Sequence, residues 1–369
     1  MKKLLLATAV AALSVSAAHA APTVYGKAFL TADYLAGSDA EYKATSTYYP
    51  TVGNPVSETY TEKEDGESNT QLNSNSSRIG LKGGEPLTAN TDLVYQLEYG
   101  VDIDENSPQF KSRDTYLGLA NKQYGTLVAG RLSAIDDNIN YANQAVGQFD
   151  NSFGGAAWDG NRVNNSMAYF SPQYNGLQFM AMYGLDGDED AGGLQDGGFG
   201  VGLKYEPAAQ PFRAGATYIG SGDFNTVRLS GAYDLNSQFG LGALYQITDN
   251  NDGAVIGEDE DGDALLWGND KENVFSISGT MKTATPWTAY AQADIISNVA
   301  GYDGADSQQF VVGGKYAFTK ATTGHLYAGY RNNEFEATTE ETVPGGRVVT
   351  TESYKQDGFG IGAGLEHKF

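Results

Sequence analysis

The chain of 369 residues contains no cysteine, which excludes a disulfide framework, a thiol nucleophile and a lipid-modified N-terminus. It has only three histidines. Long apolar runs are also absent, since beyond the N-terminus no segment approaches the ~20 apolar residues that a membrane helix requires. Basic residues are scarce, with 23 Lys and Arg against 46 Asp and Glu and a formal net charge of −23, and this balance argues against nucleic acid as a partner.

The N-terminus has the three parts of a secretory signal peptide. A start with two lysines is followed by an apolar stretch from Leu4 to Val15, and Ala18-His19-Ala20 has the small-x-small form of a cleavage site. The apolar stretch is too short to span a membrane as a helix. We therefore expect residues 1–20 to be a cleaved signal and residues 21–369 to form one exported domain.

Alternation with a period of two residues recurs along the rest of the chain. In FGVGLKY (199–205) aromatic and aliphatic residues occupy every second position, with glycine or lysine between them, and FRAGATY (212–218) and FGLGALY (239–245) repeat the scheme. This period is typical of β-strands and does not fit a helix. About sixteen such runs can be counted, consistent with the even strand numbers of single-chain outer-membrane barrels.

The connections between these runs alternate in length. We place the strands near residues 23–34, 74–83, 91–101, 112–120, 125–131, 161–170, 177–184, 198–205, 212–219, 227–234, 238–247, 273–282, 287–295, 308–318, 325–331 and 355–369. The long connections are expected at 35–73, 132–160, 248–272 and 332–354. Short turns on one side and long loops on the other are typical of a transmembrane antiparallel β-barrel.

The two faces of the runs distinguish this barrel from a soluble sheet. In SSRIGLKGG (76–84) Arg78 and Lys82 lie on one face of the expected strand, and Ile79 and Leu81 lie on the other. Aromatic residues stand at both ends of several apolar faces, six residues apart, as the girdles of an apolar band ~25 Å tall require. A soluble β-sandwich or β-helix would bury its apolar face against another sheet and has no need of such girdles. We therefore predict an all-β transmembrane barrel.

Five segments, in order, resemble the general, non-specific trimeric porins of Gram-negative outer membranes. They are VYGKAFLTADY (24–34), SSRIGLKGGEPL (76–87), SRDTYLGLANKQYGTLVAGR (112–131), NRVNNSMAYFSPQYNGLQF (161–179) and the terminal GAGLEHKF (362–369). The resemblance implies a sixteen-stranded homotrimeric barrel for passive diffusion of small hydrophilic solutes and ions, with the third loop, 132–160, folded into the lumen. It also implies contact with lipopolysaccharide and outer-membrane lipids, and recognition of the last strand, ending at Phe369, by the barrel-assembly machinery.

The resemblance also implies a pore constriction with basic residues on the wall and acids on the loop. Matched by motif, the wall cations are Lys27, Arg78, Arg113 and Arg162. The alternation agrees independently, because all four stand opposite the apolar parity. On the loop, Asp150 is our first choice for the acid that faces the arginines, followed by Asp136 and Asp137, which could instead cap a short helix. Arg131 could face the lumen or the acidic second loop of a neighbouring subunit.

Several alternatives and expectations remain at this point. A substrate-specific channel for a sugar or an organic anion would need a basic ladder, for which the inward candidates are Lys204, Arg213, Arg228, Lys282, Lys315 and Arg331. An enzyme is not expected, because no Asp or Ser constellation accompanies His325 or His367.

The acids concentrate in the long loops, where screening weakens their effect on the lumen, so we expect a weak cation preference. No cofactor is expected, although loose Ca²⁺ or Mg²⁺ binding at the acidic outer loops stays open.

Overall fold

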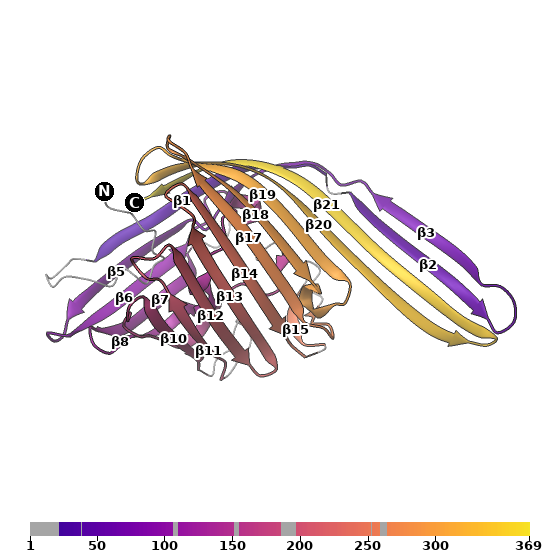
Figure 1. The fold of residues 1–369 in the computed structure, drawn as a ribbon, viewed down its shortest axis with the longest axis horizontal. Coiled ribbons are helices and arrows are strands. Elements are labelled where there is room, and N and C mark those ends of the chain that lie inside the picture. The colour runs from indigo at the N-terminus through magenta and orange to yellow at the C-terminus, as the bar shows by residue number, and fades with distance from the viewer. Residues whose placement is uncertain are drawn as a thin grey trace.

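The computed structural model describes residues 22–37, 39–105, 110–150, 155–185, 197–251, 253–258 and 264–369, and the expected signal peptide lies outside these ranges. Within them, sixteen strands form a closed antiparallel barrel (Figure 1). They are β1 (Thr23–Leu35), β5 (Arg78–Pro86), β6 (Thr91–Gly100), β7 (Lys111–Asn121), β8 (Gly125–Ser133), β9 (Arg162–Phe170), β10 (Leu177–Gly184), β11 (Phe199–Tyr205), β12 (Phe212–Ser221), β13 (Phe224–Asp234), β14 (Phe239–Asp249), β17 (Glu272–Lys282), β18 (Trp287–Ser297), β19 (Ala305–Ala317), β20 (Thr322–Val343) and β21 (Gly346–Lys368). The barrel closes at β1, which pairs with β21 on one side and with β5 on the other.

The predicted barrel and its strands are confirmed, but two of the expected long loops are wrong. Most of 35–73 forms β2 (Ala40–Pro50), β3 (Val56–Glu64) and β4 (Asn69–Ser74), and 332–354 continues β20 and β21. β3 pairs with β2, β2 with β21, and β21 with β20. Residues 40–64 and 333–356 thus form a four-stranded sheet, here named the arm, that projects from the barrel (Figure 1). A small hairpin, β15 (Val255–Glu258) and β16 (Ala264–Leu266), lies in the loop after β14.

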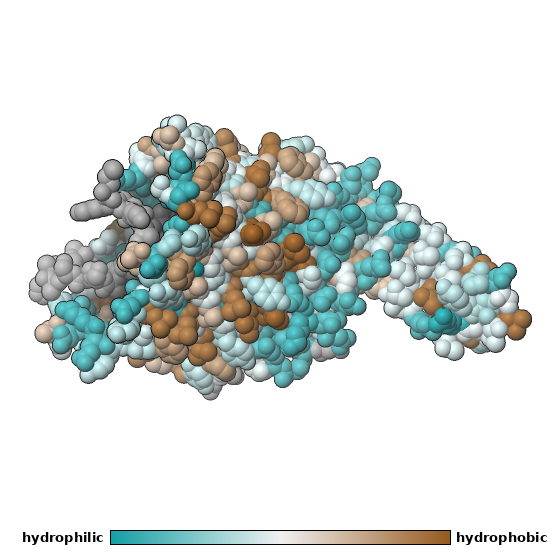
Figure 2. All heavy atoms as spheres, viewed as in Figure 1, coloured by the Kyte–Doolittle hydropathy of each residue, from teal (hydrophilic) through white to brown (hydrophobic). Residues whose placement is uncertain are grey.

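The outer face of the barrel is apolar, as the alternation predicts. On β11, Leu203 is 49% exposed on the outside, while the adjacent Lys204 points inward and is only 6% exposed. Aromatic rings of β11 and β12 pair at both ends of these strands: Phe199 with Tyr218 at 5.7 Å between centroids, and Tyr205 with Phe212 at 5.4 Å. Hydrophobic residues gather over the barrel strands, and the arm is mostly hydrophilic or neutral (Figure 2). Among the described residues, no helix is long and apolar enough to cross a membrane.

The third loop lies inside the barrel, as expected. Its described residues include two short 3₁₀ helices, η1 (Ile135–Ile139) and η2 (Gly147–Phe149), and η3 (Val299–Gly301) follows β18. Ile135 and Ile139 are fully buried in a cluster with wall residues. A Cβ atom on Gly215 of β12 would come within 2.3 Å of the Ile139 Cγ2 atom, and one on Gly329 of β20 within 2.7 Å of the Phe149 ring. Glycines of the inward parity therefore give the loop the space to lie against the wall.

The outward-pointing side chains of the barrel strands face lipid, so a charge placed among them should destabilise the protein. Leu241 of β14 is 47% exposed on the outer face, between the aromatic ends of its strand at Phe239 and Tyr245. We expect Leu241→Arg to lower the free energy of unfolding by about 1–3 kcal/mol, because an arginine would face hydrocarbon between one aromatic girdle and the middle of the bilayer. Equilibrium unfolding by urea in lipid vesicles measures this change. Leu241→Met, which keeps an apolar side chain, should change the value by less than ~1.5 kcal/mol; equal effects of the two variants would contradict a lipid-facing position.

Candidate functional site

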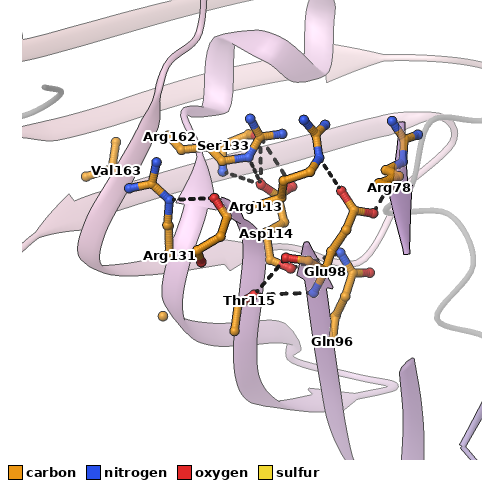
Figure 3. A network of polar contacts seen from close by, with 12 residues as sticks. Arg78, Gln96, Glu98, Arg113, Asp114, Thr115, Arg131, Ser133, Arg162 and Val163 are labelled. Carbon is orange, nitrogen blue, oxygen red and sulfur yellow. Dashed lines mark hydrogen bonds and ion pairs between the residues drawn. The ribbon is translucent and has the colours of Figure 1, made fainter. Parts of the chain in front are cut away.

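A cluster of charged side chains covers the inner wall of β5, β6 and β7 (Figure 3). The Glu98 carboxylate of β6 lies between two arginines: Arg113 Nε donates to its Oε1 atom at 2.7 Å, and Arg78 Nε lies 3.5 Å from its Oε2 atom. The Tyr25 hydroxyl of β1 donates to the same Oε2 atom at 2.9 Å. One acid thus holds two like-charged arginines side by side, and their mutual repulsion is offset.

A second acid extends the cluster to β9. Arg162 Nε donates to Asp114 Oδ1 at 2.8 Å, and the Ser133 backbone N–H and hydroxyl also donate to this oxygen, at 3.2 and 2.9 Å. Lys27 of β1 continues the row at the other end, since it pairs in register with Arg78. The four predicted wall cations therefore lie on neighbouring strands of one wall.

Two register shifts bring these groups together. Between β6 and β7, Leu97 lies opposite Thr115 but Tyr99 lies opposite Ser112, so Glu98 faces two residues of β7, Arg113 and Asp114. In a regular strand two consecutive side chains point to opposite faces. The extra residue of this β-bulge instead allows both Arg113 and Asp114 to line the lumen.

The second shift lies between β8 and β9. Gly130 is opposite Ser166, but Leu132 is opposite Val163, so Arg131 faces two residues of β9, Asn164 and Asn165. Asn165 adopts a left-handed backbone conformation with φ 43°, which asparagine tolerates better than most residues. Arg131 Nη1 donates to Asn164 Oδ1, and Nε donates to the Ser112 carbonyl at 3.2 Å. Arg131 is thereby held at the bulge by its own barrel, and a contact with a neighbouring subunit stays a prediction.

The wall cluster and the third loop line one cavity of about 490 Å³. Arg78, Glu98, Arg113, Asp114 and Arg162 line it from the wall, and Asp137, Asn138, Asn140 and Asn143 line it from the loop. The three predicted wall arginines therefore face one of the predicted loop acids, Asp137. Enclosure by protein, followed by the negative charges of Asp159 and Asp136, raises the pKa of Asp137 to about 6.

Asp136 does not face the lumen, and its prediction as an acid of the constriction is wrong. Its side chain is fully buried, where Trp158 Nε1 donates to Oδ2 at 2.8 Å and Arg228 Nη2 of β13 lies 3.4 Å from the same atom. Arg228 Nη2 also donates to Asp159 Oδ1 at 3.0 Å. Asp136 and Asp137 both lie in the first turn of η1, whose N-cap, Ala134, has no side-chain cap bond. Asp136 therefore anchors the loop to the wall through a buried ion pair.

Further polar side chains of the wall bind the backbone of the loop. Glu272 of β17 accepts a bond from the Ala157 N–H at 3.0 Å, and Gln292 of β18 accepts from the N–H of Gln144 at 2.6 Å and of Ala145 at 2.9 Å. Gln309 of β19 donates to the Phe149 carbonyl at 3.1 Å. The loop is thus attached at several points to the wall that lies away from the arginines.

Asp150, the first choice among the loop acids, follows η2 and is exposed to the lumen. Asn143 Nδ2 donates to its Oδ1 atom at 2.9 Å. The cations that act on its carboxylate are Lys27 and Lys315, so it faces the lysine end of the basic wall rather than the arginines. The loop acids therefore divide between the two parts of the wall, with Asp137 near the arginines and Asp150 near the lysines.

Sequence reasoning missed the two wall acids, Glu98 and Asp114. Glu98 could have been found from the alternation alone, since it shares the inward parity of β6 with Gln96. Asp114 could have been found in the same way, since it shares the inward parity of β7 with Tyr116. The same alternation, set by the outward Leu117 and Leu119, places Arg113 on the outer face, so the prediction of Arg113 from alternation was wrong and only the bulge brings its side chain to the lumen. Among the described residues, no group of three or more His, Cys, Asp or Glu side chains is placed to hold a metal ion.

Comparisons with known proteins agree with this fold. The model of the Gram-negative porin family matches residues 7–338. The chain is 25% identical over 406 residues, covering both chains fully, to the major outer membrane protein P.IB of Neisseria lactamica. It is 32% identical to an outer membrane porin protein of Bordetella pertussis over 134 residues, which are 34% of this chain and 35% of that protein.

Solved structures are similar in fold at low sequence identity. An anion-selective porin from Comamonas acidovorans has a TM-score of 0.63 at 16% identity, covering 95% of this chain and 99% of its own. Salmonella typhi OmpF has a TM-score of 0.58 at 16% identity, covering 90% and 98%. The family match spans most of the chain, and the closed barrel with its charged inner wall fits it. The chain therefore belongs to the Gram-negative porin family and is a porin of the outer membrane, whose lumen is a water-filled channel for passive diffusion of small hydrophilic solutes and ions.

Proposed function

We propose that Lys27, Arg78, Arg113 and Arg162 on the wall, with Asp137 and Asp150 on the third loop, form the constriction that every solute must pass. The observation that carries this proposal is the single cavity lined by the arginines on one side and by Asp137 on the other. The multiple anchors of the loop support it, because a loop held inside the barrel narrows the passage permanently.

The arrangement would select solutes by charge and hydration. Cations on one side and acids on the other create an electric field across the gap, and rings of charged side chains set which ions enter a pore. A dipolar, hydrated solute can orient in this field, whereas an apolar solute must displace ordered water. The wall acids Glu98 and Asp114 neutralise part of the basic charge, so the balance near the constriction is mixed. With acids enriched in the outer loops, a weak cation preference follows.

General diffusion is favoured over a substrate-specific channel because much of the predicted basic ladder is paired. Lys204 Nζ lies 3.4 Å from Glu206, Arg213 lies 3.8 Å from Asp234, and Arg228 is bound to the third loop. Arg331 donates to Gln309 Oε1, at 3.1 Å from Nε. A ladder of bound cations presents little free charge along which a specific anion could move.

The remaining assignments concern chemistry and partners. We propose that no bond is made or broken in the lumen: His367 Nδ1 lies 2.9 Å from the Thr322 hydroxyl, and His325 has no hydrogen-bond partner among the described residues.

A homotrimer is supported by the trimer form of a Vibrio cholerae outer membrane protein with a TM-score of 0.60. Contacts with lipopolysaccharide, recognition of Phe369 by the assembly machinery and loose Ca²⁺ or Mg²⁺ binding at the outer loops stay predictions.

Liposome swelling tests the general channel. Vesicles that contain the purified porin should swell in sugars of increasing size at rates that fall smoothly with solute size and rise linearly with concentration, because no site binds a neutral sugar. Protein-free vesicles are the control. A rate that saturates for one sugar while others of its size do not would favour a substrate-specific channel instead.

The pKa of Asp137 gives a pH-dependent prediction. Because this pKa is raised to about 6, the carboxylate is charged at pH 7.5 and is mostly protonated at pH 5, and the loop then loses one negative charge opposite the arginines. We expect the cation preference, measured from reversal potentials across a KCl gradient in planar bilayers, to fall between pH 7.5 and pH 5. Asp137→Asn should give the low-pH preference already at pH 7.5 and lose most of the change. A variant with the pH response of the wild type would refute this role.

The buried ion pair predicts how the loop is held. Arg228→Met leaves the buried Asp136 carboxylate without its cation, a loss of about 3–5 kcal/mol for a buried pair. We expect the loop to leave the wall near η1, so that single-channel conductance in KCl rises and fluctuates. Arg347→Met removes an exposed arginine of the arm that lies 2.9 Å from Glu340, and should leave conductance nearly unchanged. If both variants conduct like the wild type, the pair does not hold the loop.

A further inference from the structure

Two lysines that face the lumen beside the tip of the third loop have no acid bound to them. Among the described residues, neither Lys27 of β1 nor Lys315 of β19 forms an ion pair within 4 Å, although both reach water. Each is supported by an aromatic ring instead: the Lys27 ammonium lies 5.3 Å from the centre of the Phe29 ring, and that of Lys315 lies 4.9 Å from the Tyr290 ring. Most other inward cations are paired, so these two retain free hydrogen-bond donors.

Two buried polar side chains beside the lysines also lack partners. His325 of β20 and Tyr290 of β18 are each only 5% exposed. Both ring nitrogens of His325 and the hydroxyl of Tyr290 have no hydrogen-bond partner among the described residues. Such groups are rare in proteins, because leaving a buried donor or acceptor unpaired costs about 1–3 kcal/mol, and each calls for an explanation.

The strand register brings these four side chains to one place on the wall. Lys315 pairs directly with His325, and Tyr290 pairs with Gly313, two residues before Lys315. The His325 ring packs on Phe29 of β1 at 4.7 Å between centroids, next to Lys27. A Cβ atom on Gly313 would lie 2.4 Å from the Tyr290 hydroxyl, so this glycine provides the space for the phenol.

The carboxylates near this group leave it with positive charge. Glu366 of β21 is bound to Lys368 at 2.8 Å, and Asp150 on the loop tip is the other acid that acts on the lysines. Two lysines against one unpaired acid leave one net positive charge, surrounded by a phenol hydroxyl and an imidazole. Every free group except the imidazole acceptor nitrogen can donate a hydrogen bond to an anion, and bonds from ammonium groups to anionic oxygens are the stronger kind.

We propose that Lys27, Lys315, His325 and Tyr290 form a binding subsite for the carboxylate or phosphate group of a small anionic solute, at the edge of the constriction. The lysines provide the charge, and the buried hydroxyl and ring N–H fix the position of the group. This inference rests on the proposed function, since the solute reaches the subsite only through an open lumen. It deepens that function by adding a weak, saturable site for anions to a channel whose outer mouth is acidic.

Single-channel recording in planar bilayers tests the subsite. Inorganic phosphate or succinate is added at pH 7.5 to a bath of constant KCl. We expect at least one of the two to lower the KCl current with a saturable concentration dependence, and the anion that does so identifies the phosphate or the carboxylate as the group bound. Lys315→Met should raise the half-inhibitory concentration at least fivefold, and Tyr290→Phe, which removes only the hydroxyl, about twofold.

Lys282→Met is the matched control, because Lys282 ends β17 at the rim of the barrel, is exposed and forms no ion pair within 4 Å among the described residues. It removes the same charge and should leave the half-inhibitory concentration unchanged. Linear, non-saturating effects of both anions would overturn the subsite, and so would equal effects of Lys315→Met and Lys282→Met, which would show a response to net charge alone. A wild-type protein that conducts no KCl would contradict the channel itself, which separates the two failures.

Discussion

Each residue of a strand in this closed sheet has only two directions available, toward lipid or toward water, and the rest of the structure depends on this constraint. Because every strand has a neighbour on both sides, its backbone groups are paired within the membrane, where an unpaired group would cost several kcal/mol. A shift of one residue would move every side chain of a strand to the wrong solvent. Leu203 and Lys204, adjacent in sequence, are therefore committed to opposite environments.

The charged centre of the pore forms where this strict alternation is interrupted. The bulge opposite Glu98 brings Arg113 to the lumen beside Asp114, and the bulge opposite Arg131 reorganises β9 just after Arg162. The barrel thus concentrates acids and bases on one wall without changing the alternation elsewhere. On the opposite wall glycines, uncharged polar side chains and the buried charges of Arg228 and Glu272 hold the third loop rather than facing solutes.

Much of this could be predicted from the sequence, for reasons that also explain the misses. Wherever one face is apolar, the period of two located the strand. Lys27, Arg78 and Arg162 followed from parity and motif, whereas Arg113 followed from the motif alone because the bulge reverses its parity. The arm was missed because β2 and β3 carry tyrosine and glutamate on both faces and threonine on one, so no apolar period marks them although their residues favour strands. Asp136 and Asp137 differ in role because of tertiary packing: adjacent in sequence, one meets Arg228 and the other faces the lumen.

Two strands of the arm continue without a break from the wall of the barrel. β20 runs for 22 residues without a break, roughly 73 Å at about 3.3 Å per residue, whereas a membrane-spanning strand needs only about 9–11 residues. β21, which pairs with it along its whole length, is also the strand that meets β1 where the barrel closes. The most distant part of the molecule and the seam of the barrel therefore share the same two continuous strands. No break in either strand separates the arm from the barrel, so the arm is joined to the closure of the barrel by one continuous ladder of backbone hydrogen bonds.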